Sequence, residues 1–388
     1  MIRIYYKQNM APSTRRIWTK THTWLALSLG WLLALNALAG ALLTVAKPLD
    51  QWVNRSLFEQ PATAQTLPPA PLQTLHRQLQ DEFGPTGNFI FRPPREPGES
   101  LRVFVSGAWE GVVYFDAAGR ELGRRGETEG FFNLLFELHS TLLLGETGRA
   151  TLASLALCYL VLLVSGLVLW WPRRWPPSFK VRFERGWVTA LFDLHRTAGA
   201  LLGLALAVCI VTGAYMAWPP LRQAMTHLAG QTPITPPAVS MAPGRPASRL
   251  PLDSLVLTAQ QQFPGAMVGY IQVPGNVAKP VRVRFRLADD THPNGLSSVW
   301  LHPLTGEVLQ STRWDQLDLG SRIITVIYPL HTGALGGWPL TVAVGLLGLT
   351  MTGLAISGFW LWGRRQWLSR QQRLGTARRV QAVREQQP

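Results

Sequence analysis

Four long segments of the chain are apolar and contain no Asp, Glu, Lys or Arg. They are residues 23–46, 150–171, 197–220 and 340–363. A helix of about 20 apolar residues crosses the hydrocarbon core of a bilayer, which is about 30 Å thick. Because backbone polar groups in lipid must be satisfied within the segment, each segment is predicted to be a transmembrane helix. Trp24, Trp171, Trp218 and Trp362 near their ends are typical of a membrane interface.

Two long polar regions separate these segments, at residues 47–130 and 221–325. Each begins with a stretch of helical periodicity and continues with short alternating stretches typical of strands. The predicted helices are 72–83 and 252–263, and the predicted strands include 101–105, 113–116, 281–285 and 299–302. Each region is therefore predicted to be a small α+β domain.

The two halves of the chain resemble each other. With the first apolar segment aligned on the third, His22 falls on His195 and Gly40 falls on Gly213. With the second aligned on the fourth, His139 falls on His331 and Ser165-Gly166 falls on Ser357-Gly358. Self-similarity of this kind indicates repeated architecture. The predicted fold is an α-helical integral membrane protein with four transmembrane helices as a tandem duplication and two small external α+β domains.

Composition and charge support this interpretation. Hydrophobic residues make up 47% of the chain and charged residues 15%, against about 25% charged in soluble domains. The net charge of +15 is concentrated in short basic pieces, which identifies them as cytoplasmic and excludes nucleic acid as the partner. The predicted order is a cytoplasmic N-terminus (1–22), helices (23–46, 150–171, 191–220, 340–363), external domains (47–130, 221–325), interfacial segments (131–149, 326–339), a cytoplasmic loop (172–190) and a basic cytoplasmic tail (364–388).

Four of the eight histidines occupy matching places in the two halves: His22, His195, His139 and His331. A single histidine at a membrane interface is usually a snorkelling side chain, but four in register favour function. A proton relay needs nearby acids, and the apolar segments have none. By depth, His22 pairs with His195 and His139 with His331. Paired histidines on facing helices suit a b-type haem, and the absence of Cys-x-x-Cys-His excludes covalent attachment.

Other candidate residues carry weaker signals. His76 and His227 are predicted to be exposed on helices, whereas His292 and His302 lie in loops where they could touch a metal or a substrate. Arg282, Arg284 and Arg286 alternate along a predicted strand, so they form either a solvated face, which is favoured, or a contact for an anionic chelate. Cys158 and Cys209 are interpreted as packing residues.

Several short motifs resemble a known family. They are Trp18-Thr-Lys-Thr-His22, Glu137-Leu-His-Ser140, Tyr328-Pro-Leu-His-Thr332, Asp193-Leu-His-Arg196, the Ser-Gly-x-x-Leu-Trp ends at Ser165 and Ser357, and Thr305-Gly-Glu-Val-Leu309. The chain resembles the PepSY-associated transmembrane proteins, iron-regulated inner-membrane proteins of bacteria, and among them the FoxB-type ferric-siderophore reductases. The resemblance covers nearly the whole chain. It implies periplasmic PepSY-like domains and two b-type haems per chain.

The resemblance implies that the chain is an oxidoreductase of the bacterial inner membrane that reduces Fe(III) in an imported ferric siderophore, with both termini cytoplasmic. The partners are then the siderophore, membrane lipid and an electron donor, either a membrane quinol or a cytoplasmic reductase. One alternative is a non-enzymatic membrane-anchored PepSY sensor or partner-binding protein without haem. A second is a permease for metal or siderophore, which the few helices and the lack of intramembrane charge disfavour.

Overall fold

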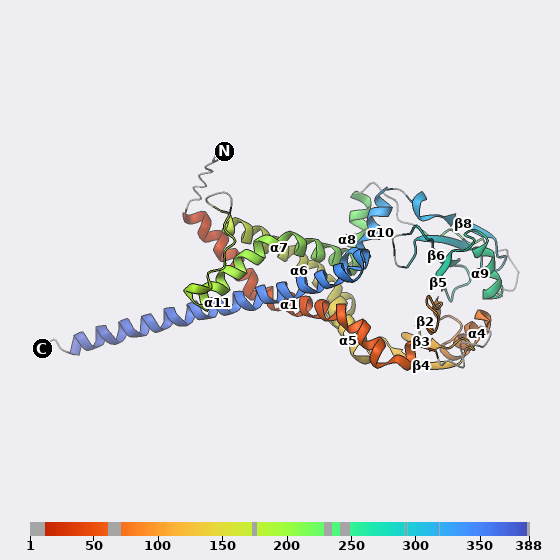
Figure 1. Cartoon of the computed structure of the whole chain (residues 1–388), viewed down its shortest axis with the longest axis horizontal. Coiled ribbons are helices and arrows are strands. Elements are labelled where there is room, and N and C mark those ends of the chain that lie inside the picture. The colour runs from red at the N-terminus through yellow and green to blue at the C-terminus, as the bar shows by residue number, and fades with distance from the viewer. Residues whose placement is uncertain are drawn as a thin grey trace. The chain divides into compact units, whose positions relative to one another are not determined.

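Four long helices follow the apolar segments. They are α1 (Pro12–Val53), α6 (Gly145–Trp170), α7 (Trp187–Ala217) and α11 (Gly337–Glu385), and each is long and apolar enough to cross a membrane. The computed structural model (Figure 1) describes residues 12–60, 71–172, 177–228, 235–240, 249–290, 292, 294–317 and 319–385. Residues 1–11 and 173–176, predicted to be cytoplasmic, lie outside the described residues. The predicted helical membrane protein is confirmed.

All four helices are longer than the apolar segments, and three of them extend furthest. α1 begins at Pro12, α7 begins at Trp187, and α11 continues to Glu385. The apolar pattern ends where the chain becomes polar, but Lys, Arg, Gln and Ala are good helix formers and continue the same backbone hydrogen bonding. As a result His22 and His195 lie within helices, and so does the acidic residue Asp193.

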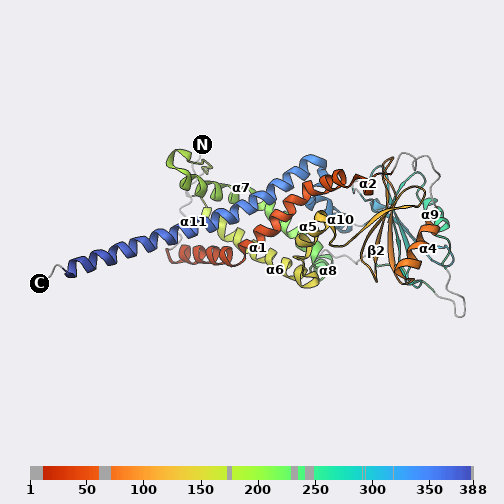
Figure 2. The same cartoon turned by 90° about the horizontal axis from the view of Figure 1, so that it is seen from below.

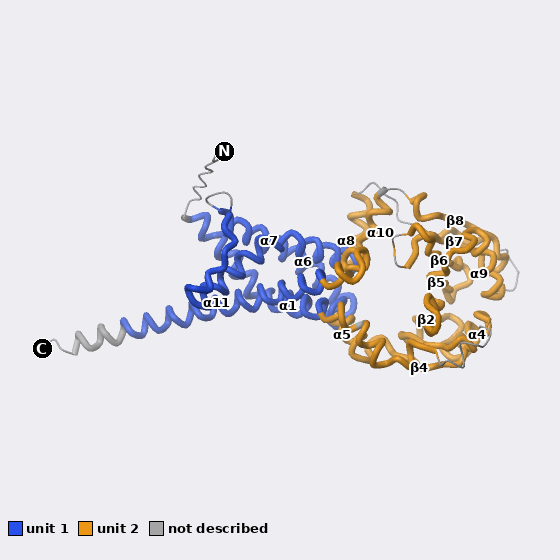
Figure 3. Tube along the Cα trace, in the orientation of Figure 1, with its two compact units in different colours: residues 1–41, 139–217, 343–388 blue, residues 42–138, 218–342 orange. Residues whose placement is uncertain are grey.

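The chain divides into two compact units, coloured separately in Figure 3. Unit 1 comprises residues 1–41, 139–217 and 343–388, and unit 2 comprises residues 42–138 and 218–342. In unit 1, α6 packs along α7, and the four long helices enclose a core that includes Leu33, Tyr159, Leu206 and Met351. Large apolar side chains also cover the outside of these helices. Leu157, Leu204 and Leu346 are each more than half exposed, as a lipid-facing surface requires.

Unit 2 contains one antiparallel sheet of eight strands in the order β4-β3-β2-β1-β5-β6-β7-β8. The strands are β1 (Asn88–Arg92), β2 (Leu101–Ser106), β3 (Gly111–Phe115), β4 (Glu121–Gly126), β5 (Met267–Val273), β6 (Val281–Arg286), β7 (Ser297–Leu301) and β8 (Val308–Thr312). Helices α4 (Leu72–Phe83) and α9 (Leu252–Gln260) lie on one face (Figure 2), over a core that includes Phe89, Phe91 and Phe285. The predicted helices and strands form nearly as expected.

The structure differs from the prediction of two separate domains, because the two α+β regions share this sheet and its core. Strand β1 pairs with β5, with Phe89 opposite Val273 and Phe91 opposite Ile271. Each strand would otherwise expose an edge of unpaired backbone groups. The helices are also tied together, because both Asp253 carboxylate oxygens accept hydrogen bonds from the α4 backbone, at Leu72 and Gln73.

Shorter helices complete unit 2 and its connections. They are α2 (Arg55–Phe58), α5 (Gly130–Thr141), α8 (Pro219–Leu228) and α10 (Leu319–His331), with single 3-10 turns at Phe183–Arg185, Trp314–Gln316 and Ala334–Gly336. Helices α5 and α10 carry His139 and His331. The sequence prediction of short helices at these two places therefore agrees with the structure.

Candidate functional site

His22 of α1 and His195 of α7 face each other inside unit 1. Their ring centroids are 6.5 Å apart, and the ring planes are nearly perpendicular, at 84°. The structure therefore brings together the pair that the sequence predicted by depth. Both rings line one cavity of about 310 Å³, whose other walls are mostly apolar, for example Ala26, Leu163 and Met351.

Each imidazole forms a hydrogen bond through its Nδ1 atom with a serine hydroxyl. The Nδ1 atom of His22 lies 2.9 Å from the Ser165 hydroxyl, and the Nδ1 atom of His195 lies 2.9 Å from the Ser357 hydroxyl. Each serine donates its single hydrogen to a backbone carbonyl one turn earlier, Leu162 or Leu354. The hydroxyl must then accept from the ring, so Nδ1 carries the proton and Nε2 keeps a free electron pair. This is the usual arrangement around a metal-bound histidine.

The residue after each serine leaves room for the ring. A Cβ atom on Gly166 would lie 3.4 Å from the His22 Cε1 atom, and one on Gly358 would lie 3.4 Å from the His195 Cε1 atom. These distances are at the short limit of ordinary contact, so a side chain larger than that of alanine at either glycine would push the imidazole away from its serine. Ser165-Gly166 and Ser357-Gly358 thus position the two histidines in the same way.

The residues of this cavity fit a b-type haem. An iron between two imidazoles, each about 2 Å from the metal, holds the ring centres about 6 Å apart, close to the separation found here. Arg196 lines the cavity, and its Nε atom is buried with no hydrogen-bond partner. A guanidinium in that position suits a haem carboxylate. Within the described part of the chain, no three His, Cys, Asp or Glu side chains gather as a site for a bare metal ion.

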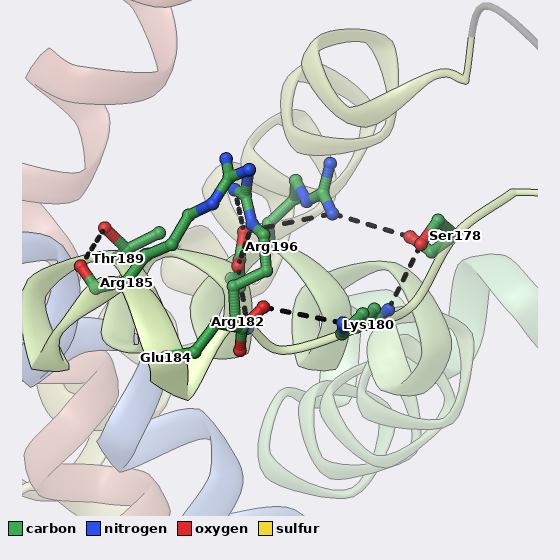
Figure 4. A network of polar contacts seen from close by, with 8 residues as sticks. Ser178, Lys180, Arg182, Glu184, Arg185, Thr189 and Arg196 are labelled. Atoms are coloured by element: carbon green, nitrogen blue, oxygen red, sulfur yellow. Dashed lines mark hydrogen bonds and ion pairs between the residues drawn. The ribbon is translucent and has the colours of Figure 1, made fainter.

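A polar network anchors the start of α7 near His195. The Asp193 carboxylate is fully buried and accepts hydrogen bonds from Nε and Nη2 of Arg182, each at 2.8 Å. Figure 4 shows this region, in which Lys180 pairs with Glu184 and Arg196 reaches the Ser178 carbonyl. The apolar segments contain no acid, as predicted, but α7 begins before its apolar segment and so includes Asp193. The pairing of Asp193 with Arg182 makes it a structural anchor.

His139 also lies in unit 1, against α1. Its Nδ1 atom is 2.9 Å from the backbone carbonyl of Asn36 and donates to it. A Cβ atom on Gly40 would lie 2.6 Å from the His139 Cε1 atom, so only glycine admits this ring. His139 was predicted on a short helix at the membrane surface. It does lie on the short helix α5, but its side chain points toward α1.

His331 is the last residue of α10 and belongs to unit 2. Its predicted pairing with His139 therefore stays a prediction. Tyr328, one turn earlier on the same helix, stacks on His292 with ring centroids 6.1 Å apart.

Of the other four histidines, three are buried and one is exposed. His76 is 2% exposed and packs against Phe89 and Phe91, so the prediction of an exposed residue is wrong, whereas His227 is exposed as predicted. The place of His76 on the inner face of the amphipathic helix α4 explains its burial. His292 and His302 are buried, and each Nδ1 atom accepts backbone N–H groups in its own turn. Burial and the charges of Arg284 and Arg95 lower the pKa of His292 to about 4.

Sequence reasoning missed the residues that position the ligands. Ser165, Ser357, Gly40 and Arg196 appeared only within matching positions or motifs and were given no role, and Asn36 was not singled out. The serines carried a usable signal, because they recur at the same register in both halves. The role of Asn36 rests on a backbone carbonyl and leaves no signal in the sequence.

Comparisons with known proteins agree with the helical architecture. A family model described as the PepSY-associated TM region matches residues 19–365. The chain is also 30% identical over 275 residues to the uncharacterized protein PA4219 of Pseudomonas aeruginosa. That alignment covers 60% of this chain and 64% of the relative, so the chain spans less than two thirds of the relative's length.

Proposed function

The chain belongs to the family of PepSY-associated transmembrane proteins, and from that premise we propose that it is a dihaem oxidoreductase of the bacterial inner membrane. It reduces Fe(III) in an imported ferric siderophore at the periplasmic face. One observation carries the proposal: His22 and His195 face each other 6.5 Å apart, each with Nδ1 engaged by a serine.

Four side chains hold the cofactors. His22 and His195 are the ligands of one haem, and His139 and His331 are the proposed ligands of the other. A b-type haem bound by two histidines supplies a one-electron Fe(III)/Fe(II) centre. The serines and the Asn36 carbonyl keep the imidazoles oriented, and the apolar walls of the cavity exclude water from the cofactor.

The proposed topology follows from the charges. Both termini and residues 172–190 lie in the cytoplasm, where Lys and Arg accumulate, and residues 47–130 and 221–325 lie in the periplasm. The two halves are a tandem duplication, in which α1 corresponds to α7 and α6 corresponds to α11. Electrons come from a membrane quinol or a cytoplasmic reductase.

Reduction releases iron because the oxygen donors of siderophores are hard ligands that bind Fe(III) far better than Fe(II). One electron converts one Fe(III) to Fe(II), and a two-electron donor such as a quinol serves two Fe(III) centres and gives up two protons. The product is a weakly held Fe(II) that leaves the chelate.

A reduced-minus-oxidised absorbance spectrum of the purified full chain, with haem quantified per chain, tests the proposal. We expect two b-type haems. His22→Ala and His195→Ala should each remove the same haem and leave the other, because both ligands serve one iron.

His227→Ala is the matched control, because this histidine is exposed on α8, and it should keep full haem content. A colourless protein, made with ample haem supply, would contradict the proposal and favour the partner-binding anchor. Loss of different haems in the two ligand variants would show that His22 and His195 do not share an iron.

A further inference from the structure

The sheet of unit 2 has a second face, opposite α4 and α9, that is unusually rich in arginine. Side chains alternate along β6, so that Val281, Val283 and Phe285 enter the core while Arg282 and Arg284 point to the other side. Both arginines are partly buried, and only Arg286 at the end of the strand is exposed. The favoured prediction of a solvated strand face is therefore wrong for Arg282 and Arg284.

Strand register places further arginines beside them. Arg102 of β2 is opposite Arg92 of β1 and Tyr114 of β3, and Arg284 of β6 is opposite Tyr270 of β5. Neighbouring strands are about 4.8 Å apart, so these residues form a continuous row across β3, β2, β1, β5 and β6. Arg95 lies over the Tyr270 ring, with its guanidinium carbon 5.3 Å from the ring centroid. We call Arg92, Arg95, Arg102, Arg282 and Arg284 the arginine face.

Positive charge on the arginine face is only partly balanced. Glu99 accepts hydrogen bonds from Arg92 and Arg102, each at 2.7 Å. Among the described residues, Asp290 is the other carboxylate whose charge acts on these groups, and its oxygens accept from the backbone N–H groups of His292 and Leu296. In the part of the chain that the structure describes, five guanidinium groups thus face two carboxylates.

Several donors on this face have no partner. The Nε atoms of Arg102, Arg282 and Arg284 are buried and make no hydrogen bond, and Arg102 is only 9% exposed. Burial and the charge of Arg284 lower the pKa of Arg282 to about 10, and burial and the charge of Arg92 lower the pKa of Arg102. Arg102 is paired with Glu99, whereas terminal nitrogens of Arg282 and Arg284 donate to the Ser298 hydroxyl and the Gly295 carbonyl. Buried cations without a hydrogen-bonded carboxylate are costly, so Arg282 and Arg284 favour a bound anion.

Aromatic rings accompany the guanidinium groups. The guanidinium carbon of Arg282 lies 4.8 Å from the Trp300 ring centroid, and that of Arg102 lies 4.8 Å from the Phe58 ring centroid. Such neighbours hold a guanidinium flat and leave its edge for carboxylate or phenolate oxygens. The face also adjoins α10, because the charge of Arg95 acts on Tyr328, one turn before His331.

We propose that the arginine face is the substrate site, and that it selects ferric chelates with anionic oxygen donors, of the catecholate or carboxylate class, over neutral or cationic hydroxamate complexes. This inference rests on the proposed function for its substrate. The anionic oxygen atoms of such a chelate balance the excess positive charge of the arginine face. The bound Fe(III) gains one electron, originally from the external donor, and leaves as Fe(II), while the chelate keeps its own atoms.

Equilibrium binding to the oxidised full chain tests this without any turnover. The probes are redox-inert gallium(III) complexes, one a trianionic tris-catecholate and the other a neutral trihydroxamate. We expect the tris-catecholate to bind at least about tenfold more tightly, and its affinity to fall with added salt. Arg102→Gln and Arg284→Gln should each weaken it about tenfold and leave the trihydroxamate unchanged.

Two variants serve as controls. Arg286→Gln lies on the same strand but is exposed, and it should change the tris-catecholate affinity by less than about twofold. Arg284→Lys keeps the charge and tests whether the planar guanidinium itself is needed; it should bind the tris-catecholate more tightly than Arg284→Gln does. The circular dichroism spectrum of each variant reports whether the sheet remains folded, because the arginines lie in unit 2 and His22 and His195 lie in unit 1.

Equal affinity for the two complexes, or an unchanged affinity in both Gln variants, would overturn the arginine-face inference while leaving the haem proposal intact. Selective tris-catecholate binding by a protein that lacks haem would do the reverse. In that case the anion site stands and the reductase proposal fails.

Discussion

At the scale of single residues, the protein is notable for how its histidines are oriented. A hydroxyl has one hydrogen, and Ser165 and Ser357 each donate it to a backbone carbonyl one turn earlier in their own helix. The imidazoles of His22 and His195 must therefore donate through Nδ1, and each presents Nε2 to the cavity. The orientation is set before any cofactor arrives, which lowers the entropy cost of binding one.

Removing these hydroxyls should weaken haem binding without abolishing it. In Ser165→Ala and Ser357→Ala we expect the affinity for the haem between His22 and His195 to fall about 10- to 100-fold, the usual cost of losing a partner of a metal ligand. Haem transfer to an acceptor protein measures this. Ser154→Ala is the matched control, because Ser154 is exposed on α6, the helix of Ser165, and its hydroxyl donates to the Ala150 carbonyl of that helix. Equal haem retention in all three variants would show that the serines do not orient the ligands.

At the scale of elements, unit 2 is held together by contacts between its two halves. Helix α4 begins at Leu72 after Pro71 and has no cap of its own. Its free backbone N–H groups are satisfied by Asp253 of α9, while the Gln73 side chain accepts the Leu252 backbone N–H in return. Since helix ends leave such groups unsatisfied, each helix depends on the other half of the chain.

Replacing this shared cap should loosen both helices locally. For Asp253→Ala we expect the free energy of local opening at the start of α4 to fall by about 1 kcal/mol, the typical value of a capping side chain. Hydrogen exchange of the α4 amides in the full chain measures the change. Asp81→Ala, on the exposed side of α4, should leave protection unaltered. Faster exchange confined to α9 would contradict the role of Asp253 as the α4 cap.

At the scale of the whole molecule, the chain combines a helical unit with an apolar exterior and a unit built on one wide sheet. The apolar surface of α1, α6, α7 and α11 suits lipid, whereas the sheet unit carries its core between α4, α9 and the strands. In the proposed topology the two units meet different solvents. Of the four proposed haem ligands, His22, His139 and His195 belong to unit 1 and His331 belongs to unit 2.

Protease added to intact spheroplasts tests this topology. Because residues 47–130 and 221–325 are proposed to be periplasmic, we expect cleavage within them, with a tag on the C-terminus remaining uncut. Lysed spheroplasts provide the comparison, since there the tag should be removed as well. Removal of the tag in intact cells would reverse the proposed orientation.

The sequence alone determined the four membrane helices, the short helices with His139 and His331, and most strands, because these depend on local hydrophobic periodicity. It also singled out His22 and His195 as a pair. The tertiary structure decided what depends on contacts between distant segments. It joined the two α+β regions through β1 and β5, buried His76, and assigned Ser165 and Ser357 to the histidines. It also gathered the arginine face, because strand register, which brings Arg102 beside Arg92, is invisible in a linear pattern.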